Sequence, residues 1–424
     1  MYGFVNRVVG VLKKVVPEPL VRPLRPLYHR ALAFLMALSY GFPARKLVVI
    51  GVTGTKGKST VSDLIYATLL DNGYAVAVAS TIRFAIKDQS EPNLFKMTMP
   101  GRGFIQNFLH RAVQAGCTHA VVEITSESTL NFRHLFLDLD ALVFTNLQKE
   151  HIESHGSFEK YAAAKMKIGE SLSASPKRPR AIIANADDPA SAPYMALPVE
   201  KKFPFSYTDA KDVELLPGQV RFTFQGARFH MQLPGSFNIM NALAAANAAR
   251  FVGLSIEKSA AALAKLKRVP GRTERIDAGQ AFNVVVDYAH TPDSLAALYA
   301  AYPGRKICVL GNTGGGRDTW KRSEMGRIAD ASCAKVILTN EDPYDEDPRA
   351  IVNAMAAGMK RMPEIIMDRR AAICAALRAA RPDDTVLVSG KGTDPFIMGP
   401  RDMKTPWSDA HVVREELQRL LAEF

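Results

Sequence analysis

The amino-acid sequence predicts an α/β protein with two successive domains, each built on a parallel sheet. Short, continuous apolar runs alternate with stretches of helix length, which favours parallel strands covered by helices on both faces. A glycine-rich loop follows the first apolar run, at residues 51–57. A second round of alternation begins after the breaker cluster Val269-Pro270-Gly271-Arg272, so a domain boundary is expected near residue 270.

The elements of the first domain, residues 47–268, follow from this pattern in order. The first apolar run, 47–50, is expected to be a strand, and helical spacing begins after the glycines at 61–70. Residues 201–232 alternate apolar and polar across a glycine turn, which predicts an antiparallel hairpin at the edge of the domain. The further expected strands are 75–80, 120–124, 141–145 and 181–184, and the further expected helices are 103–115, 157–172, 238–252 and 256–266.

The second domain, residues 269–424, is expected to be a smaller, doubly wound, Rossmann-like α/β domain. Its apolar runs are again short and continuous, and helix-length stretches separate them. The expected strands are 283–287, 306–310, 335–339 and 385–388.

Composition and charge exclude several classes of protein. The 424 residues are too many for a single core. An apolar share of 47% and a charged share of 23% exclude a disordered, collagen-like or fibrous chain. The net charge is +12, but eight Lys or Arg residues against the single Glu18 lie within residues 1–46. The mild excess elsewhere indicates an anion-binding cleft rather than a basic stripe, so no nucleic-acid partner is expected.

The sequence predicts that residues 1–46 form a basic amphipathic N-terminal segment. The apolar run that begins at Ala31 is about half as long as a membrane-spanning helix requires. A secretory signal would need a small-residue cleavage site and a chain that folds outside, so a cytoplasmic protein is expected. Two alternatives remain open: the segment packs on the body, or it lies peripherally on an anionic membrane surface.

The cysteines give no sign of a covalent or metal framework. Cys117, Cys308, Cys333 and Cys374 are scattered and form no C-x-x-C pair. Neither a disulfide framework nor a thiolate zinc site is therefore expected, which is typical of a reducing cytoplasm.

The strongest motif is the octapeptide of residues 53–60, between an expected strand and an expected helix. In this context glycines let backbone N–H groups wrap a phosphate chain. Lys58 would reach the terminal phosphates, and the Ser59 hydroxyl would bind Mg²⁺. The spacing departs from G-x-x-x-x-G-K-[ST] because Val52 occupies the first glycine position, so a variant nucleotide-binding loop is expected. Its residues are Thr53, Gly54, Thr55, Lys56, Gly57, Lys58, Ser59 and Thr60.

This loop resembles the T-G-T-[NK]-G-K-[ST] signature of the Mur ligases, the ATP-dependent amide-forming enzymes of peptidoglycan assembly. The matches cover about residues 45–420 and look most like the MurE type, the UDP-N-acetylmuramoyl-tripeptide synthetases. They continue, in the family's order, with Glu123-Ile124-Thr125-Ser126, Phe144-Thr145-Asn146-Leu147, His151, Ala164-Lys165, Asn185-Ala186-Asp187-Asp188-Pro189, Gly235-Ser236-Phe237-Asn238, Asp287-Tyr288-Ala289-His290, Gly315-Gly316-Arg317-Asp318 and Gly390-Lys391-Gly392.

The resemblance implies a mechanism and its metal ligands. ATP converts a carboxylate into an acyl phosphate, which the amine of an amino acid then attacks. Ser59 and Glu123 would hold one Mg²⁺, and His151 would help to hold a second. Lys165 would be carbamylated by CO₂, which turns its ammonium into an anion able to coordinate metal. Lys58, Glu123, His151 and Lys165 thus form the implied catalytic set. Taken singly, the last three could be ordinary solvated or loop side chains, but their joint placement around the loop favours the site.

Further site residues are implied by resemblance alone. Asn238 and Asn241 start an expected helix and could simply cap it, but the resemblance implies that Asn238 lies near the ATP base. Arg272 and Asp287 would join the nucleotide pocket, although they could form an ordinary ion pair. The muramoyl-peptide acceptor would be held by Thr98, Thr125, Asn131 and Arg133, and the incoming amino acid by Arg317, Tyr344, Gly390 and Asp394.

Two departures from the family pattern bear on the substrates. Only 46 residues precede the loop region, whereas a standard MurE-type enzyme carries a UDP-binding domain there. On this interpretation, we expect the acceptor to be held by the remaining cleft, or to be carried differently, for example by a membrane-borne lipid. Glu341-Asp342-Pro343-Tyr344 replaces the D-N-P-R motif of diaminopimelate-adding enzymes. Tyrosine cannot pair with a distal carboxylate as arginine does, and two carboxylates would favour a cationic side chain such as that of lysine.

The expected protein is thus a monomeric ATP-dependent ligase that joins an amino acid to a muramoyl peptide. One rival is a folylpolyglutamate synthase-like ligase of the same superfamily. Another is a non-catalytic, membrane-associated ATP-binding scaffold. A nucleic-acid motor is disfavoured because the sequence has no basic groove interleaved with aromatic residues.

Overall fold

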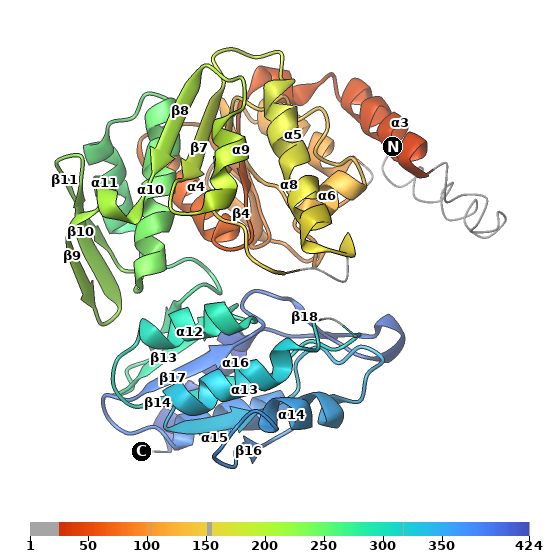
Figure 1. The fold of residues 1–424 in the computed structure, drawn as a ribbon. Helices are drawn as coiled ribbons and strands as arrows, with labels where there is room; N and C mark the ends of the chain where they lie inside the picture. The colour runs from red at the N-terminus through yellow and green to blue at the C-terminus, as the bar shows by residue number, and fades with distance from the viewer. Residues whose placement is uncertain (1–24, 102, 151–154, 317, 424) are drawn as a thin grey trace. The chain divides into compact units, whose positions relative to one another are not determined.

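The computed structural model describes residues 25–101, 103–150, 155–316 and 318–423 (Figure 1). These residues divide into two compact units. The first unit takes the described parts of Met1–Lys211 together with Thr223–Arg228 and Met240–Leu263. The second unit takes Asp212–Phe222, Phe229–Ile239 and the described parts of Ala264–Phe424.

The main sheet of the first unit has the strand order β4-β3-β2-β5-β1-β6-β7-β8. The strand that precedes the phosphate loop, β1 (Val48–Thr53), lies between β5 and β6 and is parallel to both. Six strands of this sheet are parallel, which confirms the five strands that the sequence predicts and adds a sixth. These are β1, β2 (Val76–Ala79), β5 (His119–Glu123), β6 (Ala141–Phe144), β7 (Ala181–Asn185) and β8 (Lys201–Phe205).

Two antiparallel strands extend this sheet beyond what the sequence pattern predicts. They are β3 (Arg83–Ile86) and β4 (Gln89–Pro92), joined by a turn in which Lys87 has a positive φ. The residues of β4 are polar or proline and all are exposed. Such a strand has no apolar run, so a search for buried strands passes over it.

Helices α5 (Phe104–Gln114) and α8 (Phe158–Ser173) pack on one face of the main sheet. Phe108 and Leu109 of α5 and Ile168 of α8 share a buried cluster with alternate strand residues. The side chain of Ser157 caps α8 by accepting a hydrogen bond from the backbone N–H of Lys160. The other α-helices of this part of the chain are α3 (Arg25–Ser39), α4 (Lys58–Asp71), α6 (Ser126–Leu130), α9 (Ala192–Met195), α10 (Ser236–Phe251) and α11 (Ile256–Lys265).

The predicted hairpin at 201–232 is only partly correct. Residues 201–205 form β8 of the main sheet instead. The alternating stretch forms β10 (Gln219–Phe224) and β11 (Ala227–Met231), which are neighbours in a separate three-stranded sheet completed by β9 (Lys211–Leu216).

The second unit contains a six-stranded sheet of order β12-β13-β17-β14-β15-β16. Only β12 (Glu274–Ile276) is antiparallel to its neighbour. The other strands are β13 (Asn283–Asp287), β14 (Lys306–Leu310), β15 (Lys335–Leu338), β16 (Glu364–Ile365) and β17 (Thr385–Ser389). A two-stranded sheet is formed by β18 (Phe396–Met398) and β19 (Lys404–Pro406).

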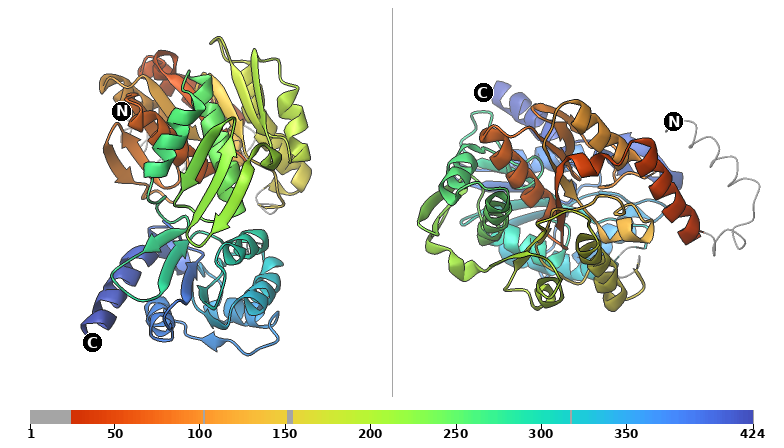
Figure 2. Two further views of the ribbon diagram at one scale, coloured as in Figure 1. Left: turned by 90° about the vertical axis from the view of Figure 1, so that its left-hand side faces the viewer. Right: turned by 90° about the horizontal axis from the view of Figure 1, so that it is seen from above.

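Successive residues of β13 enter different cores, which confirms the doubly wound architecture. Val284 and Val286 pack with α15 (Arg369–Arg378) and α16 (Asp409–Ala422). Val285 packs instead with α12 (Pro292–Ala300) and α13 (Lys321–Ser332). Helices therefore cover both faces, as the left view of Figure 2 shows for this unit. The remaining α-helix, α14 (Pro348–Ala356), packs against α13 and β15.

A disulfide joins Cys308 to Cys333, so the expectation that the cysteines form none is wrong for this pair. Cys308 lies in β14 and Cys333 follows the last residue of α13. The two are 25 residues apart in sequence, and the return of the helix to the sheet brings their Cα atoms to 6.2 Å. The spacing of the cysteines in the sequence does not reveal that a helix connecting two parallel strands brings this pair together. Cys117 and Cys374 are free.

None of the described helices is long and apolar enough to cross a membrane.

Candidate active site

The glycine-rich loop joins the carboxyl end of β1 to the start of α4, as predicted. Gly54 has φ +143°, and a Cβ there would lie 1.9 Å from the hydroxyl of Thr145. Gly57 caps α4 with φ +81°, and a Cβ there would lie 2.5 Å from the side-chain oxygen of Asn241. Both positions therefore require glycine, because the backbone is left-handed and other groups approach it closely.

Residues that follow β6 hold this loop in place. The backbone N–H of Thr55 donates to the carbonyl oxygen of Asn146 at 2.9 Å, and that of Lys56 donates to the Asn146 side-chain oxygen at 2.8 Å. The Thr145 hydroxyl donates to the Lys56 carbonyl at 2.6 Å. The loop is thus preorganised by β6, the neighbour of β1 in the sheet.

The loop presents positive charge at the start of a helix. The side-chain nitrogen of Lys58, the first residue of α4, donates to the carbonyl oxygen of Thr55 at 2.8 Å. Unsatisfied backbone N–H groups at a helix N-terminus favour anions, and a neighbouring ammonium strengthens that preference. The predicted loop residues 53–60 are therefore arranged as a phosphate cradle would be.

Glu123 and Ser59 meet beside this loop. The Ser59 hydroxyl donates to the Glu123 carboxylate at 3.1 Å, and Glu123 is buried. Oxygen ligands of this kind suit Mg²⁺, which prefers hydroxyl, carboxylate and phosphate oxygens. The pair therefore fits a magnesium ion, whereas His151, the residue expected to help hold a second ion, lies outside the described residues.

Thr81 is a site residue that the sequence interpretation missed. Its backbone N–H and hydroxyl donate to the two oxygens of Glu123, at 2.8 and 3.0 Å. Its hydroxyl also lies 2.7 Å from that of Thr98. Because Thr81 uses its one hydroxyl proton toward the carboxylate, Thr98 donates to Thr81. Thr81 directly follows the expected strand 75–80, so its place at the carboxyl edge of the parallel sheet could have indicated it.

Lys165 reaches the loop from α8. Its side-chain nitrogen donates to the Gly54 carbonyl oxygen at 2.6 Å and lies 5.0 Å from the ring centre of Tyr161. Burial lowers the pKa of Lys165 well below its ordinary value, and the nearby Lys58 cation lowers it further. A lysine with a lowered pKa carries a free electron pair on a larger fraction of molecules and can act as a nucleophile.

Tyr161 is a further residue that the site predictions omitted. The Tyr161 hydroxyl lies 2.9 Å from that of Thr55. Asn241 is the asparagine of α10 that faces Gly57. The predicted Asn238 is buried and donates to the carbonyl oxygen of Pro234 at 2.8 Å.

The four residues predicted to hold the acceptor divide into two groups. Thr98 joins the Glu123 network through Thr81, and Arg133 donates to the carbonyl oxygen of the adjacent Met99 at 2.7 Å. Thr125 precedes α6, and the side chain of Asn131 donates to Glu127 within that helix region at 3.3 Å. The structure thus connects Thr98 with Arg133, while Asn131 bonds locally.

In the second unit, the charge of Arg272 acts on the carboxyl group of Asp287. Asp287 accepts backbone N–H groups of Thr273 at 2.6 Å and Ala289 at 2.7 Å. Burial raises the pKa of Asp287, and these hydrogen bonds and the Arg272 charge oppose the rise. The Arg272 guanidinium lies 4.3 Å from the ring centre of Tyr288.

The sequence predicts that both carboxylates of residues 341–344 are available to a cationic side chain, and the structure differs from this prediction. Asp342 accepts hydrogen bonds from the side chain of Lys391 and the backbone of Met398, both at 2.8 Å. Asp342 and Lys391 are both buried. Asp342 is therefore neutralised by the chain's own lysine and cannot serve an incoming cation as a free charge.

Glu341 retains an available oxygen. Its Oε1 accepts the Thr313 hydroxyl at 3.0 Å, while its buried Oε2 has no hydrogen-bond partner among the described residues. Burial raises the pKa of Glu341. Gly390 has φ +107°, and a Cβ there would lie 2.1 Å from Oε2, so only glycine leaves this oxygen its space.

Three other predicted residues belong to this region of the second unit. Asp394 lies 3.6 Å from the side-chain nitrogen of Lys391. Tyr344 has a positive φ and its ring lies against Gly315. Arg317 lies outside the described residues.

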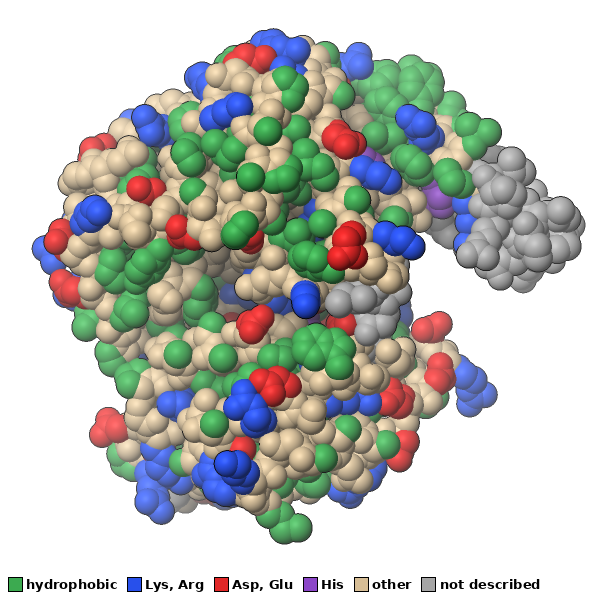
Figure 3. All heavy atoms as spheres, in the orientation of Figure 1, with side chains coloured by type: hydrophobic (Ala, Val, Ile, Leu, Met, Phe, Trp, Pro, Cys, Tyr) green, Lys and Arg blue, Asp and Glu red, His purple; other side chains and the backbone are tan. Residues whose placement is uncertain are grey.

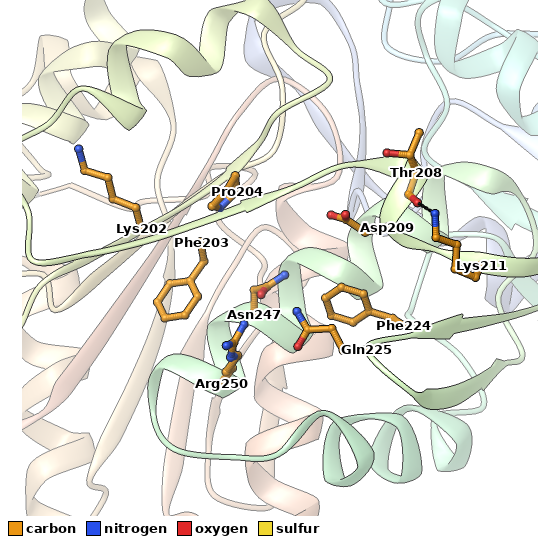
Figure 4. A pocket seen from close by; sticks show the side chains of 10 residues that line it. All are labelled: Lys202, Phe203, Pro204, Thr208, Asp209, Lys211, Phe224, Gln225, Asn247 and Arg250. Atoms are coloured by element: carbon orange, nitrogen blue, oxygen red, sulfur yellow. Dashed lines mark hydrogen bonds between the residues drawn. The ribbon is translucent and has the colours of Figure 1, made fainter.

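A cavity of about 280 Å³ lies elsewhere in the first unit, between β8, α10 and the end of β10 (Figure 4). Phe203, Phe224 and Asn247 line it, with Lys211 and Arg250 among its charged residues. None of the predicted site residues lines this cavity, so it is separate from the phosphate loop.

The fold and the loop are typical of an α/β protein that binds nucleotide phosphates, and sequence comparison identifies its family and, through the family, the ligase class. Residues 52–249 match the Mur ligase middle domain, and residues 271–392 match the Mur ligase, glutamate ligase domain. The chain belongs to the Mur ligase family. The predicted family, fold class and ligase activity are thereby confirmed.

Several relatives carry informative names. The chain is 37% identical to the "UDP-N-acetylmuramyl-tripeptide synthetase" of Roseiflexus sp. (strain RS-1), over 96% of this chain and 85% of the relative. It is 35% identical to the "UDP-N-acetylmuramoyl-L-alanyl-D-glutamate--2,6-diaminopimelate ligase" of Geobacillus kaustophilus (strain HTA426), over 90% of this chain and 80% of the relative.

Solved structures agree in fold. One of a UDP-N-acetylmuramoyl-L-alanyl-D-glutamate--2,6-diaminopimelate ligase has a TM-score of 0.60 at 29% identity, covering 88% of this chain and 79% of the other. The folylpolyglutamate synthase of Mycobacterium tuberculosis has a TM-score of 0.70 at 16% identity, covering 86% and 93%. The second likeness shows a shared fold alone.

Proposed function

We propose that this ligase joins an amino acid to a UDP-N-acetylmuramoyl peptide, or to a related carrier, in an ATP-dependent step of peptidoglycan synthesis. The observation that carries the proposal is the meeting of Lys58, Glu123 and Lys165 around one variant phosphate loop. The names of the relatives support the acceptor class.

The proposed reaction has two steps. A carboxylate oxygen of the acceptor bonds to the γ-phosphorus of ATP, the bond from that phosphorus to the bridging oxygen breaks, and ADP leaves. The amine nitrogen of the amino acid then bonds to the acyl carbon, phosphate leaves, and the nitrogen loses a proton. Catalysis of phosphoryl transfer is mainly positioning and charge stabilisation, which the loop N–H groups and Lys58 would supply.

Ser59 and Glu123 would hold magnesium. When bound, Mg²⁺ offsets the negative charge that develops on the phosphate oxygens. A second ion, with His151 among its ligands, is part of the proposal.

Carbamylation would turn the side chain of Lys165 into an anion that can coordinate metal. The lone pair of its unprotonated nitrogen bonds to the carbon of CO₂, the nitrogen loses a proton, and a carbamate replaces a cation. The buried position and lowered pKa of Lys165 support this proposal, because only the unprotonated amine reacts.

The proposed amino acid carries a second amine and only one carboxylate, as lysine does. Glu341 Oε2 would accept the distal ammonium, and Asp394 would accept a hydrogen bond from the α-ammonium. Tyr344 stands where the diaminopimelate-adding motif has arginine, which removes the partner of a second carboxylate. Arg317 would pair with the α-carboxylate.

Phosphate release across a matrix of acceptors and amino acids tests the function. Release that needs a muramoyl peptide, an amino acid and Mg-ATP together supports the proposal. Release stimulated by folate and glutamate would favour the folylpolyglutamate synthase-like alternative. An absence of release with any pair, with ATP bound, would favour the scaffold alternative.

A further inference from the structure

Helix α3 carries apolar side chains on two opposite faces. On its inner face Met36 and Ala37 are buried, and Met36 packs so closely on Gly103 that a Cβ there would lie 2.5 Å from its sulfur. Beyond the helix end, the Tyr40 hydroxyl accepts a hydrogen bond from the side chain of Asn107 at 2.8 Å. The inner face therefore fixes α3 on the first unit.

The outer face of α3 is also apolar, and it is exposed. Leu27, Leu35 and Leu38 are 68%, 54% and 53% exposed. Their spacing of eight and then three residues places them on one side of a helix. Tyr28 and Phe34 are exposed as well. Figure 3 shows hydrophobic side chains gathered where Figure 1 draws α3. We call Leu27, Phe34, Leu35 and Leu38 the outer stripe.

An exposed apolar patch of this kind marks an interaction surface. Aromatic rings extend the outer stripe onto the body, since the ring centre of Phe34 lies 5.8 Å from that of Phe136 and 6.1 Å from that of Phe42. The apolar surface thus extends from α3 to Phe42 and Phe136.

The charged residues of α3 itself are all basic, whereas the carboxylate of Asp138, two residues after Phe136, is paired with Arg45 at 2.9 Å. Arg25 and Arg30 lie on α3, and the helix contains no acidic residue. The Arg30 guanidinium lies 5.7 Å from the ring centre of Phe132. Apolar and aromatic residues flanked by arginine are typical of helices that lie in the interface of an anionic bilayer. A second copy fits less well, because like charges would face each other across a twofold contact.

We propose that the outer stripe of α3 docks this enzyme on anionic phospholipid membranes. Leu27, Leu35 and Leu38 enter the boundary between headgroups and acyl chains, while Arg25 and Arg30 contact headgroup phosphates. The helix lies along the surface, in keeping with its length. The proposal goes beyond the ligase reaction and does not depend on which amino acid is added.

Vesicle flotation of the full chain at ~0.15 M salt tests the docking. The key variant is Leu35→Glu with Leu38→Glu, and the matched control is Met362→Glu, because Met362 is 99% exposed in the second unit. Wild type and the control are expected to float with phosphatidylglycerol-containing vesicles and not with phosphatidylcholine vesicles. The double variant is expected to float at least ten-fold less. Circular dichroism and phosphate release without vesicles should be unchanged, which separates docking from catalysis.

Two results would overturn the proposal. One is wild-type protein that stays at the bottom of the gradient with anionic vesicles. The other is a double variant that floats as well as wild type. Light scattering tests the alternative that a second copy of the chain covers the outer stripe. That alternative would be correct if the wild-type protein is a dimer, binds no vesicles, and becomes a monomer on the double substitution.

Discussion

The side-chain nitrogen of Lys165 donates a 2.6 Å hydrogen bond to the carbonyl oxygen of Gly54, 111 residues away in sequence. This contact brings a buried amine from α8 to the loop that would cradle the phosphates of ATP. The lowered pKa of Lys165 follows from the same burial. The proposed reaction of Lys165 with CO₂ rests on this position and on this lowered pKa.

Replacing Lys165 with alanine should lower phosphate release by about 100-fold or more, because the site loses a charge-stabilising group. Lys167→Ala is the matched control, since Lys167 is exposed on the same helix. With ¹³C-labelled bicarbonate, NMR should detect a carbamate in wild type and the control but not in Lys165→Ala. An active wild-type enzyme without that carbamate signal would refute the modification.

Replacing Glu123 with glutamine should reduce the Mg²⁺-dependent rate by about 100-fold. The amide keeps the size of the side chain but removes the negative charge beside Ser59. Glu170→Gln, at an exposed position of α8, should retain wild-type activity. The measurement is phosphate release against Mg²⁺ concentration, and equal curves for both variants would mean that Glu123 does not hold the metal.

Thr81 is predicted to be a positioning residue for Glu123. Thr81→Ala removes one hydrogen bond to a buried carboxylate, a loss of about 1.5–3 kcal/mol. The Mg²⁺ concentration for half-maximal activity should rise about ten-fold, and Thr81→Ser should restore it because serine keeps the hydroxyl. A merely structural role would lower thermal stability in the alanine variant and leave the Mg²⁺ dependence unchanged.

Glu341→Gln tests the choice of amino acid. The amide removes the negative charge that would pair with a distal ammonium, so KM for lysine should rise about ten-fold while kcat changes little. Glu364→Gln, at an exposed edge strand of the same sheet, is the control. Efficient use of diaminopimelate by the wild-type enzyme would contradict the proposed specificity.

Two ion pairs of the second unit should differ in their contribution to stability. Arg369 donates two hydrogen bonds to Asp409, at 2.8 and 2.6 Å, and both residues are buried. Arg369→Met leaves a buried carboxylate uncompensated and should reduce the free energy of unfolding by about 3–5 kcal/mol. Arg378→Met breaks a similar but exposed pair with Glu423 and should change the free energy of unfolding far less, because solvent screens an exposed pair.

Urea unfolding followed by tryptophan fluorescence measures this difference, because both tryptophans, Trp320 and Trp407, lie in the second unit. Equal midpoints for the two variants would show that burial does not set the contribution of these pairs.

The local pattern of apolar residues and glycines was sufficient to predict the order of most strands and helices and the position of the glycine-rich loop. The apolar run of β1 and the glycines after it determine a strand, a turn and a helix within a few residues, so the phosphate cradle could be predicted. The parallel sheet followed from continuous apolar runs such as Ile182 and Ile183 of β7. The polar β4 gave no such signal.

Contacts between distant residues could not be predicted in the same way. Asp342 is neutralised by Lys391, 49 residues later, and Cys308 pairs with Cys333 through the return of α13. Both depend on which strands become neighbours in the folded sheet. Thr81 was missed because a single threonine after a strand has no motif, and only the position of Glu123 on the adjacent β5 gives it a role.

The central claim is that the acceptor carboxylate is activated by phosphorylation before nitrogen captures it. Oxygen transfer tests this most directly, with a UDP-N-acetylmuramoyl dipeptide labelled with ¹⁸O in its reacting carboxylate and mass spectrometry of the phosphate released. The proposed mechanism predicts one ¹⁸O atom in each phosphate, because the carboxylate oxygen that bonds to phosphorus leaves with it. Unlabelled phosphate, released together with amide product, would contradict it.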